Sequence, residues 1–391
     1  MLNTALSPWP SFTQEEADAV SRVLLSNKVN YWTGSECREF EKEFAAFAGT
    51  QYAVALSNGT LALDVALKAM GIGAGDDVIV TSRTFLASAS CIVTAGANPV
   101  FADVDLNSQN ISAETIKAAL TPNTKAIIVV HLAGMPAEMD GIMDLAKEHD
   151  LWVIEDCAQA HGAKYKGKSV GSIGHVGAWS FCQDKIMTTG GEGGMVTTND
   201  KELWSKMWSY KDHGKSYDAV YHREHAPGFR WLHESFGTNW RMMEMQAVIG
   251  RIQLKRMPEW TARRQAHAAK LAESLGKFAG IRLIEIADYI EHAQYKFYAF
   301  VKPEHLKEGW TRDRIVNELN ARKVPCYQGS CSEVYLEKAF DNTPWRPKER
   351  LKNAVELGDT SLMFLVHPTL TDDEIAFCKE HIEAVLAQAT A

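Results

Sequence analysis

The sequence has no excess of basic charge. Its 41 lysine and arginine residues are outnumbered by 49 aspartate and glutamate residues, which gives a formal net charge of −8 at pH 7. A protein that binds nucleic acid along its surface normally carries a clustered basic face, so this balance argues against a nucleic-acid partner. A small anionic ligand can still be bound by local groups.

The sequence also lacks long apolar runs, paired cysteines and a targeting segment. No uncharged stretch reaches about 18 residues, and the N-terminus shows no basic segment followed by an apolar run. The seven cysteines are scattered, which is typical of free thiols in a reducing compartment, and no cysteine or histidine group has metal-site spacing. We therefore expect a soluble, cytoplasmic protein that binds no metal and does not contact a membrane.

What the chain does contain is enough apolar sequence for a large core. Its 391 residues are 46% apolar and 23% charged, an ordinary globular mixture without a disordered signature. A chain of this length exceeds one typical domain. We expect a large domain over residues 1 to 250, including an N-terminal helical segment, and a smaller domain over residues 251 to 391.

From residue 52 onward, short apolar runs alternate with helical stretches, as is typical of βα units around a mostly parallel sheet. The expected strands cover residues 52 to 56, 77 to 80, 99 to 104, 126 to 131 and 151 to 155. The expected helices between them cover residues 61 to 70, 86 to 95, 113 to 120 and 139 to 149. Earlier in the chain, Thr13 is expected to cap a helix to about residue 26, and a second helix over residues 36 to 48 places Phe40, Phe44 and Phe47 in the core.

The second half of the chain has a more mixed pattern. Residues 211 to 238 show no clear periodicity, which predicts a long loop. A long helix is expected to open at Asn239, to be interrupted near Pro258 and to continue to about residue 275. Strands over residues 281 to 284 and 295 to 301, with helices over 312 to 321 and 372 to 386, complete the smaller domain.

One lysine, Lys185, lies between two short strand-like runs, residues 178 to 181 and 195 to 198, and four glycines follow it closely. Glycines gather where backbone must turn sharply or approach another group, so this loop is expected to fold under a ligand. A lysine in such a turn, with Ser180 five residues before it, suits a Schiff-base amine beside a phosphate site. The alternative is an ordinary solvated surface lysine.

Polar and aromatic residues follow the expected strands where ligands gather in parallel sheets. Gly59 and Thr60 open a helix whose N–H groups suit an anion, although a simple helix cap explains them equally well. Phe85 follows the second strand and can lie flat on a heteroaromatic ring. Asp156 ends the fifth strand, where a buried carboxylate requires a cation, either a protonated pyridine nitrogen or an internal arginine.

In this order the motifs resemble those of the DegT/DnrJ/EryC1/StrS family of sugar aminotransferases, and the likeness covers nearly the whole chain. The motifs are Ser57-Asn-Gly-Thr, Gly75-Asp-Asp-Val-Ile-Val-Thr, Thr84-Phe85, Phe101-Ala-Asp-Val-Asp, Val153-Ile-Glu-Asp-Cys-Ala-Gln-Ala-His-Gly, Ser180-Phe, Lys185, Gly191-Glu-Gly-Gly, His213-Gly, Asn239-Trp-Arg-Met and His367-Pro-Thr-Leu-Thr. The resemblance implies the α/β fold type I architecture of the aspartate aminotransferase superfamily. That fold has a large domain with a mostly parallel seven-stranded sheet flanked by helices, and a smaller C-terminal α+β domain.

The resemblance also implies a cofactor and a reaction. Lys185 would hold pyridoxal 5′-phosphate as an internal aldimine and shuttle a proton, and Asp156 would pair with the pyridine N–H. The other implied cofactor contacts are Phe85 on the ring, Gln159 near the 3-hydroxyl, and Gly59, Thr60, Ser180 and Asn239 on the phosphate. Because Asn239 would come from a second subunit, the resemblance implies a homodimer with shared active sites. The reaction would move an amino group from L-glutamate to a nucleotide-linked 4-keto-6-deoxy or 3-keto sugar, in surface polysaccharide or amino-sugar synthesis.

Substrate contacts are less clearly indicated, and other family activities stay open. The candidate substrate-binding residues are Tyr31, Trp32, Arg230, Arg241 and Tyr327; for the first two core packing is the alternative, and for the arginines ion pairs. Relatives that act as dehydratases place histidine where this chain has Lys185, so the lysine weighs against that chemistry. A regulatory family member would need a DNA-binding segment and a basic patch, and the sequence shows neither.

Overall fold

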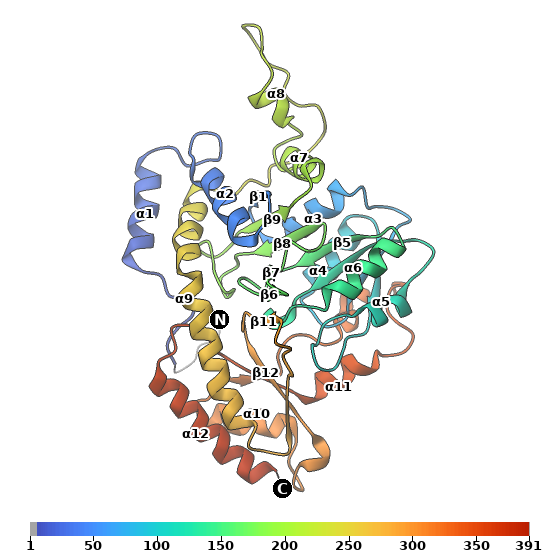
Figure 1. Ribbon diagram of the computed structural model, residues 1–391, viewed down its shortest axis with the longest axis vertical. Helices are drawn as coiled ribbons and strands as arrows, with labels where there is room; N and C mark the ends of the chain where they lie inside the picture. The colour runs from blue at the N-terminus through green and yellow to red at the C-terminus, as the bar shows by residue number, and fades with distance from the viewer. Residues whose placement is uncertain (1–5, 391) are drawn as a thin grey trace.

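The computed structural model describes residues 6–390; the first five residues and residue 391, which the expected domain ranges include, lie outside it. A central sheet with its helices forms the upper body in Figure 1, a smaller unit lies below it, and the long helix α9 (Glu244–Leu275) runs along both. No helix in the described part of the chain combines the length and apolar character needed to span a membrane.

The central sheet has seven strands and is mostly parallel, which confirms the expected fold class. In sheet order the strands are β1 (Tyr52–Leu56), β9 (Gly194–Thr198), β8 (Val176–Ser180), β5 (Trp152–Asp156), β4 (Thr124–Val130), β2 (Asp77–Thr81) and β3 (Asn98–Ala102). Only β9 runs against its neighbours, pairing antiparallel with both β1 and β8. The carboxyl ends of the other six strands therefore lie at one edge.

Helices cover both faces of this sheet, which is why its strands read as nearly continuous apolar runs. The helices are α3 (Gly59–Ala69), α4 (Ala87–Thr94), α5 (Ala113–Ala119), α6 (Met139–Glu148) and α7 (Lys201–Tyr210). Alternate residues of one strand enter opposite cores: Val78 and Val80 pack in the cluster under α3 and α4, whereas Ile79 packs with α5 and α6. Both cores are thus built from the same short strands.

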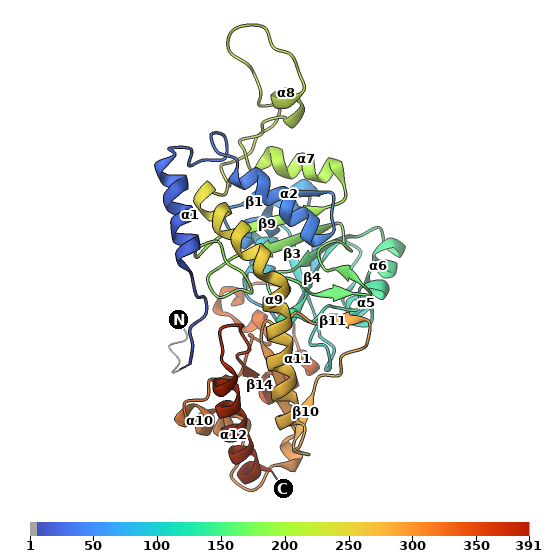
Figure 2. The same ribbon diagram turned by 60° about the vertical axis from the view of Figure 1, so that its left-hand side comes forward.

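The N-terminal helices follow the expectation closely. Helix α1 (Gln14–Leu25) begins with a capping box in which Thr13 and Glu16 satisfy each other's backbone N–H groups. Helix α2 (Glu36–Ala48) buries Phe40 and Phe44 completely, while Phe47 is partly buried against the same cluster. Both helices pack against α9, as Figure 2 shows from a second side.

Helix α9 differs from the expectation in two ways. It begins at Glu244 rather than Asn239, and it continues through Pro258 without a break. A proline inside a helix removes one backbone hydrogen bond. Here packing outweighs that loss, because α9 is buried against α1, α2 and α12 (Asp372–Ala389) on either side of the proline. The proposed domain boundary between residues 250 and 251 lies inside this helix.

The smaller unit is an antiparallel sheet with helices on it, confirming the expected α+β character. Its strand order is β10 (Ile281–Leu283), β12 (Phe297–Val301), β14 (Ser361–Phe364) and β13 (Cys326–Tyr327). Helices α10 (Arg312–Ala321), α11 (Lys352–Thr360) and α12 accompany it, while β11 (Ile290–Glu291), β6 (Lys164–Tyr165) and β7 (Lys168–Ser169) form a third small sheet. The sequence pattern did not predict β13, β14 or α11.

A long irregular segment projects from the upper body, and we call residues 211 to 238 the arm. It contains only the short helix α8 (Tyr217–Tyr221), and the loop beyond α8 extends away from the upper body in Figures 1 and 2. Three of its aromatic side chains are largely exposed: Phe229 at 74%, Trp231 at 79% and Phe236 at 99%. Such a group of exposed aromatics is typical of an interaction surface.

Candidate active site

A cavity of about 970 Å³ lies between the carboxyl edge of the central sheet and the smaller unit. Its walls come from the segments that follow β1, β2, β5 and β8, and from residues around β12 and β13. The sequence-predicted residues that line it are Gly59, Thr60, Phe85, Asp156, Gln159, Ser180 and Lys185. The topology thus brings residues from four strand ends to one site, as parallel sheets do.

Asp156 ends β5 at the floor of the cavity and is 7% exposed. Its carboxylate accepts hydrogen bonds from the Ser88 hydroxyl (2.8 Å) and the Ala158 N–H (3.1 Å). Burial raises the pKa of Asp156, and these hydrogen bonds and the nearby Lys185 offset only part of that effect. Within residues 6–390 no basic side chain forms an ion pair with Asp156, so the internal-arginine alternative is not realised.

Lys185 lies in the loop between β8 and β9, with its ammonium 5.5 Å from the ring centroid of Tyr295. Its N–H donates to the carbonyl of Cys182 (3.1 Å), which closes a turn. The Tyr295 hydroxyl donates to Asp184 (2.6 Å). Burial raises the pKa of Asp184, but the charge of Lys185 and the Tyr295 hydroxyl more than offset this, so the pKa lies below its ordinary value. Lys185 is half-buried in the cavity wall and is not a solvated surface lysine.

The N-terminus of α3 opens into the cavity beside Ser180. Asn58 caps the helix, because its side chain accepts the N–H of Leu61 (3.0 Å). Backbone N–H groups of the first helical turn have no partner inside the helix and favour an anion. A Cβ atom at Gly59 would lie 2.5 Å from the Ser180 Cβ, so the close approach of α3 to β8 requires glycine.

These residues fit the cofactor that the resemblance implies. Phe85 is 70% exposed although it lines a cavity, and therefore presents a free aromatic face for a planar ring. Asp156 supplies a carboxylate without a cationic partner, which a protonated pyridine nitrogen would provide. Gln159 is held by its carbonyl, which accepts the N–H of Ala133 (2.8 Å). The α3 N-terminus and Ser180 supply donors for a phosphate.

Several cavity residues had no signal in the sequence. Ser88 orients Asp156 and is itself bonded to the Thr84 hydroxyl (2.9 Å), but it reads as an ordinary residue of α4. Tyr295, Lys296 and Tyr298 come from the smaller unit, more than 100 residues after Lys185. Burial lowers the pKa of Lys296 to about 8. Only the folded chain shows that these groups face the Lys185 loop.

Two proposed substrate residues, one buried in the core and one partly buried against it, do not line the cavity. Tyr31 is 2% exposed; its hydroxyl donates to Glu41 (3.1 Å), and the Lys211 ammonium lies 3.4 Å from its ring centroid. Trp32 packs edge-on against Trp208, with ring centroids 6.1 Å apart. Both aromatic rings pack against neighbours of their own chain, and a role for them in substrate binding stays a prediction.

The remaining proposed residues also lie outside the cavity wall of their own chain. Arg241 forms an ion pair with Asp212 (2.8 Å), the alternative considered from the sequence, and Arg230 is exposed on the arm. Tyr327 pairs with β14 at the end of the smaller sheet. Asn239 is exposed beside the arm, and its backbone pairs with that of Asp212 in an isolated antiparallel β-bridge. Its expected role in a second subunit remains a prediction.

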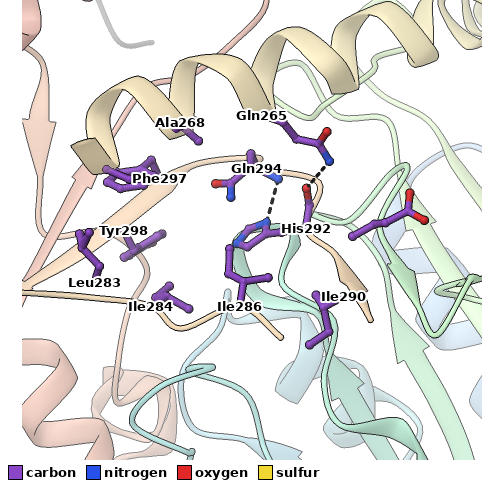
Figure 3. A pocket seen from close by; sticks show the side chains of 13 residues that line it. Gln265, Ala268, Leu283, Ile284, Ile286, Ile290, His292, Gln294, Phe297 and Tyr298 are labelled. Atoms are coloured by element: carbon purple, nitrogen blue, oxygen red, sulfur yellow. Dashed lines mark hydrogen bonds between the residues drawn. The ribbon is translucent and has the colours of Figure 1, made fainter. Parts of the chain in front are cut away.

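A second cavity, of about 360 Å³, lies between α9 and the segment that leads into β12 (Figure 3). Its wall is closed by two hydrogen bonds, from Gln265 to the carbonyl of His292 (3.1 Å) and from the N–H of Gln294 to the His292 ring (2.8 Å). None of the sequence-predicted site residues lines it. Tyr298 lines both cavities. The candidate chemistry therefore belongs to the larger cavity.

Known proteins share both the sequence and the fold. An aminotransferase from Psychrobacter cryohalolentis, solved by X-ray crystallography, is 66% identical and superposes with a TM-score of 0.96 over 98% of this chain and 99% of its own. The UDP-N-acetyl-3-dehydro-alpha-D-glucosamine 3-aminotransferase of Acidithiobacillus ferrooxidans is 44% identical, covering 91% of this chain and 90% of the relative. The GDP-perosamine synthase of Escherichia coli O157:H7 is 42% identical, covering 95% and 96%.

The model of one protein family matches residues 10–383, nearly the whole chain. This match and the identities above confirm the resemblance drawn from the motifs. The chain belongs to the DegT/DnrJ/EryC1/StrS aminotransferase family.

Proposed function

We propose that the protein is a pyridoxal 5′-phosphate-dependent aminotransferase that moves an amino group from L-glutamate to a nucleotide-linked keto sugar. The observation that carries this proposal is the shared cavity, in which the Lys185 amine, the Asp156 carboxylate and the N-terminus of α3 line one space. The names of the two sugar-nucleotide relatives described above support the substrate class. We expect this reaction to take place in the cytoplasm, as a step of O-antigen or other surface polysaccharide synthesis.

Each cavity residue has a distinct part in this proposal. When bound, the cofactor supplies an electron sink for cleavage of a C–H bond. Lys185 would hold the cofactor through its amine and would move the proton at the reacting carbon. Asp156 would keep the pyridine nitrogen protonated, and Phe85 would orient the ring by stacking. Gly59, Thr60 and Ser180 would bind the phosphate.

The two sugar classes to distinguish are the 3-keto and the 4-keto-6-deoxy nucleotide sugars. The Acidithiobacillus relative is named for a 3-dehydro sugar linked to UDP, which favours the first class. Purified protein loaded with cofactor would be incubated with L-glutamate and each nucleotide-linked keto sugar, and the products weighed by mass spectrometry. A product in which the keto oxygen is replaced by an amine supports the proposal. Loss of water without amine transfer would instead indicate the dehydratase activity.

We propose that Lys296 binds the carboxylate of the amino donor. Its ammonium lies 4.7 Å from the centroid of the same Tyr295 ring that faces Lys185. The α-carboxylate of glutamate is one bond from the reacting carbon, whereas the diphosphate of a sugar nucleotide lies several bonds away. Lys296 lines the same cavity as Lys185 and would place a positive charge near a small anion bound beside the reacting atoms.

This role predicts a pH-dependent affinity for glutamate. Because burial lowers the pKa of Lys296 to about 8, its positive charge is present below that pH and lost above it. The KM for L-glutamate should rise about tenfold per pH unit above pH 8, while the KM for the sugar stays nearly constant. Lys296→Met should show a high KM for glutamate at every pH, and Lys296→Arg should remove the pH dependence. Equal effects on both substrates would contradict the assignment.

We propose a homodimer in which Asn239 binds the cofactor phosphate of the partner's site. Asn239 is exposed and stands at the base of the arm, whose three exposed aromatics suit burial against a second copy. Mixing Lys185→Ala subunits with Asn239→Ala subunits should then restore activity from two weakened proteins. In a mixed dimer one site combines intact Lys185 and intact Asn239, so about one quarter of the wild-type activity is expected after random reassociation. No recovery, with mixed dimers verified by native mass spectrometry, would rule out sharing.

A further inference from the structure

The indole of Trp9 touches the catalytic loop directly. Its N–H donates to the backbone carbonyl of Lys185 at 2.8 Å, across a sequence separation of 176 residues. The Lys185 carbonyl lies in the loop between β8 and β9, outside the sheet ladder that ends at Ser180 and Gly194. The contact therefore orients backbone that the sheet itself does not fix.

The ring of Trp9 is held from three directions. Trp260 packs edge-on with ring centroids 5.0 Å apart, His367 stacks at 6.0 Å, and the Arg264 guanidinium lies 5.0 Å from the ring centroid. Arg264 is 1% exposed, and its Nε and Nη2 have no hydrogen-bond partner among the described residues. A buried cation without a carboxylate partner is attracted to the face of an indole, which gives Arg264 a reason to be there.

The N-terminal segment fastens the same loop a second time. Glu16 accepts a hydrogen bond from the Gln253 amide (2.8 Å), and the Gln253 carbonyl accepts the N–H of Thr188 (2.8 Å). On its other side the segment is tied to the smaller unit, where the Thr369 hydroxyl donates to the carbonyl of Pro8 (2.8 Å). The strap, residues 7 to 16, thus contacts Lys185 directly and Thr188 through Gln253 of α9.

We infer that Trp9 is a positioning residue for Lys185. A lysine side chain has many rotamers, so the direction in which its backbone points sets the space its amine samples. Fixing the carbonyl keeps the amine over Tyr295 and facing the cavity, where small misplacements are costly to a group that must both bond and transfer a proton. This inference rests on the proposed role of Lys185.

The test compares Trp9→Phe, which keeps an aromatic ring and removes the N–H donor, with Trp260→Phe. The control removes an indole from the same aromatic cluster without touching Lys185. Cofactor-free protein is mixed with pyridoxal 5′-phosphate, and the rate of covalent linkage is followed by absorbance. We expect Trp9→Phe to slow this linkage and to lower kcat about tenfold, while KM stays within about twofold of the wild-type value. The pH at which the bound cofactor changes colour should also shift. Trp260→Phe should keep all four values near wild type.

The inference is overturned if Trp9→Phe has the same linkage rate, kcat and colour transition as the control. It is also overturned if these values fall equally in both variants. If Trp9→Phe does not fold, a benzothienyl-alanine at position 9, which keeps the ring shape and lacks the N–H, makes the same comparison. Lys185→Ala distinguishes failure of the positioning role of Trp9 from failure of the proposed role of Lys185. If it still forms the linked cofactor, the role of Lys185 fails; if it does not, and Trp9→Phe matches the control, only the positioning role fails.

Discussion

Replacing Lys185 with alanine is expected to abolish the covalently held cofactor and to lower the amination rate by roughly 10⁴-fold or more, because in the proposed function one side chain both holds the cofactor and moves the proton. The change removes a half-buried side chain from a loop, so the protein should fold normally. The yellow absorption of wild-type protein, and its change on adding L-glutamate, should both be missing. Absorbance titration and single-turnover product analysis measure the two effects.

Lys296→Ala is the matched control, because Lys296 is the second lysine against the same Tyr295 ring. That variant should keep the covalent linkage and lose affinity for glutamate. Borohydride reduction followed by peptide mapping shows which lysine carries the cofactor. A label found on Lys296 in wild-type protein would contradict the assignment of Lys185.

Replacing Asp156 with asparagine has the second largest expected effect. The substitution keeps the shape and the Ser88 contact but removes the negative charge that would keep the pyridine nitrogen protonated. Loss of such an electrostatic partner in a buried site costs roughly 10² to 10³ in kcat or more. Glu192→Gln, which neutralises another carboxylate lining the cavity, should change kcat far less. Equal kcat values for the two variants would show that the charge at position 156 has no special role.

The same substitution should have the opposite effect on the stability of the cofactor-free protein. Burial raises the pKa of Asp156 above its ordinary value of 3.8, so folding favours the protonated form. The buried charge lowers the free energy of unfolding. This loss of stability begins as the pH rises above 3.8 and is complete once the pH exceeds the pKa of Asp156 in the folded protein. Cofactor-free Asp156→Asn should therefore melt at a higher temperature than wild type at pH 7, and the difference should vanish below about pH 4. Calorimetry at the two pH values checks this, and a lower Tm at pH 7 would contradict it.

The sequence predicted the parts of the site that rest on local pattern. Asp156 and Lys185 follow strands whose apolar runs are visible in the chain, and the topology of a parallel sheet then requires their ends to meet. Gly59 and Thr60 were visible for the same reason, since they open a helix directly after a strand. Asn58 was missed as the cap because the glycine beside it carried the stronger signal.

Residues whose role depends on distant packing were not predictable in this way. Tyr295 and Lys296 precede an ordinary strand, and nothing local indicates that this strand faces the large domain. Trp9 lies before the first helix, where a lone aromatic residue has many possible neighbours. Pro258 gave a wrong prediction for the opposite reason: the local rule is sound, but contacts of α9 with α1, α2 and α12 outweigh one missing hydrogen bond.

The reversed strand β9 has a consequence for engineering. Ser180 and Gly194 are paired across β8 and β9, so the thirteen residues between them form a loop that begins and ends at one pair of facing residues in the sheet. The two ends of this segment are already joined by the sheet, so a substitute segment would need to match that spacing and to fill the buried positions of Phe181, Ile186 and Met187. A graft from a related enzyme would keep its register if it retained a partner for Gln253, and could carry a different cavity wall into an unchanged scaffold.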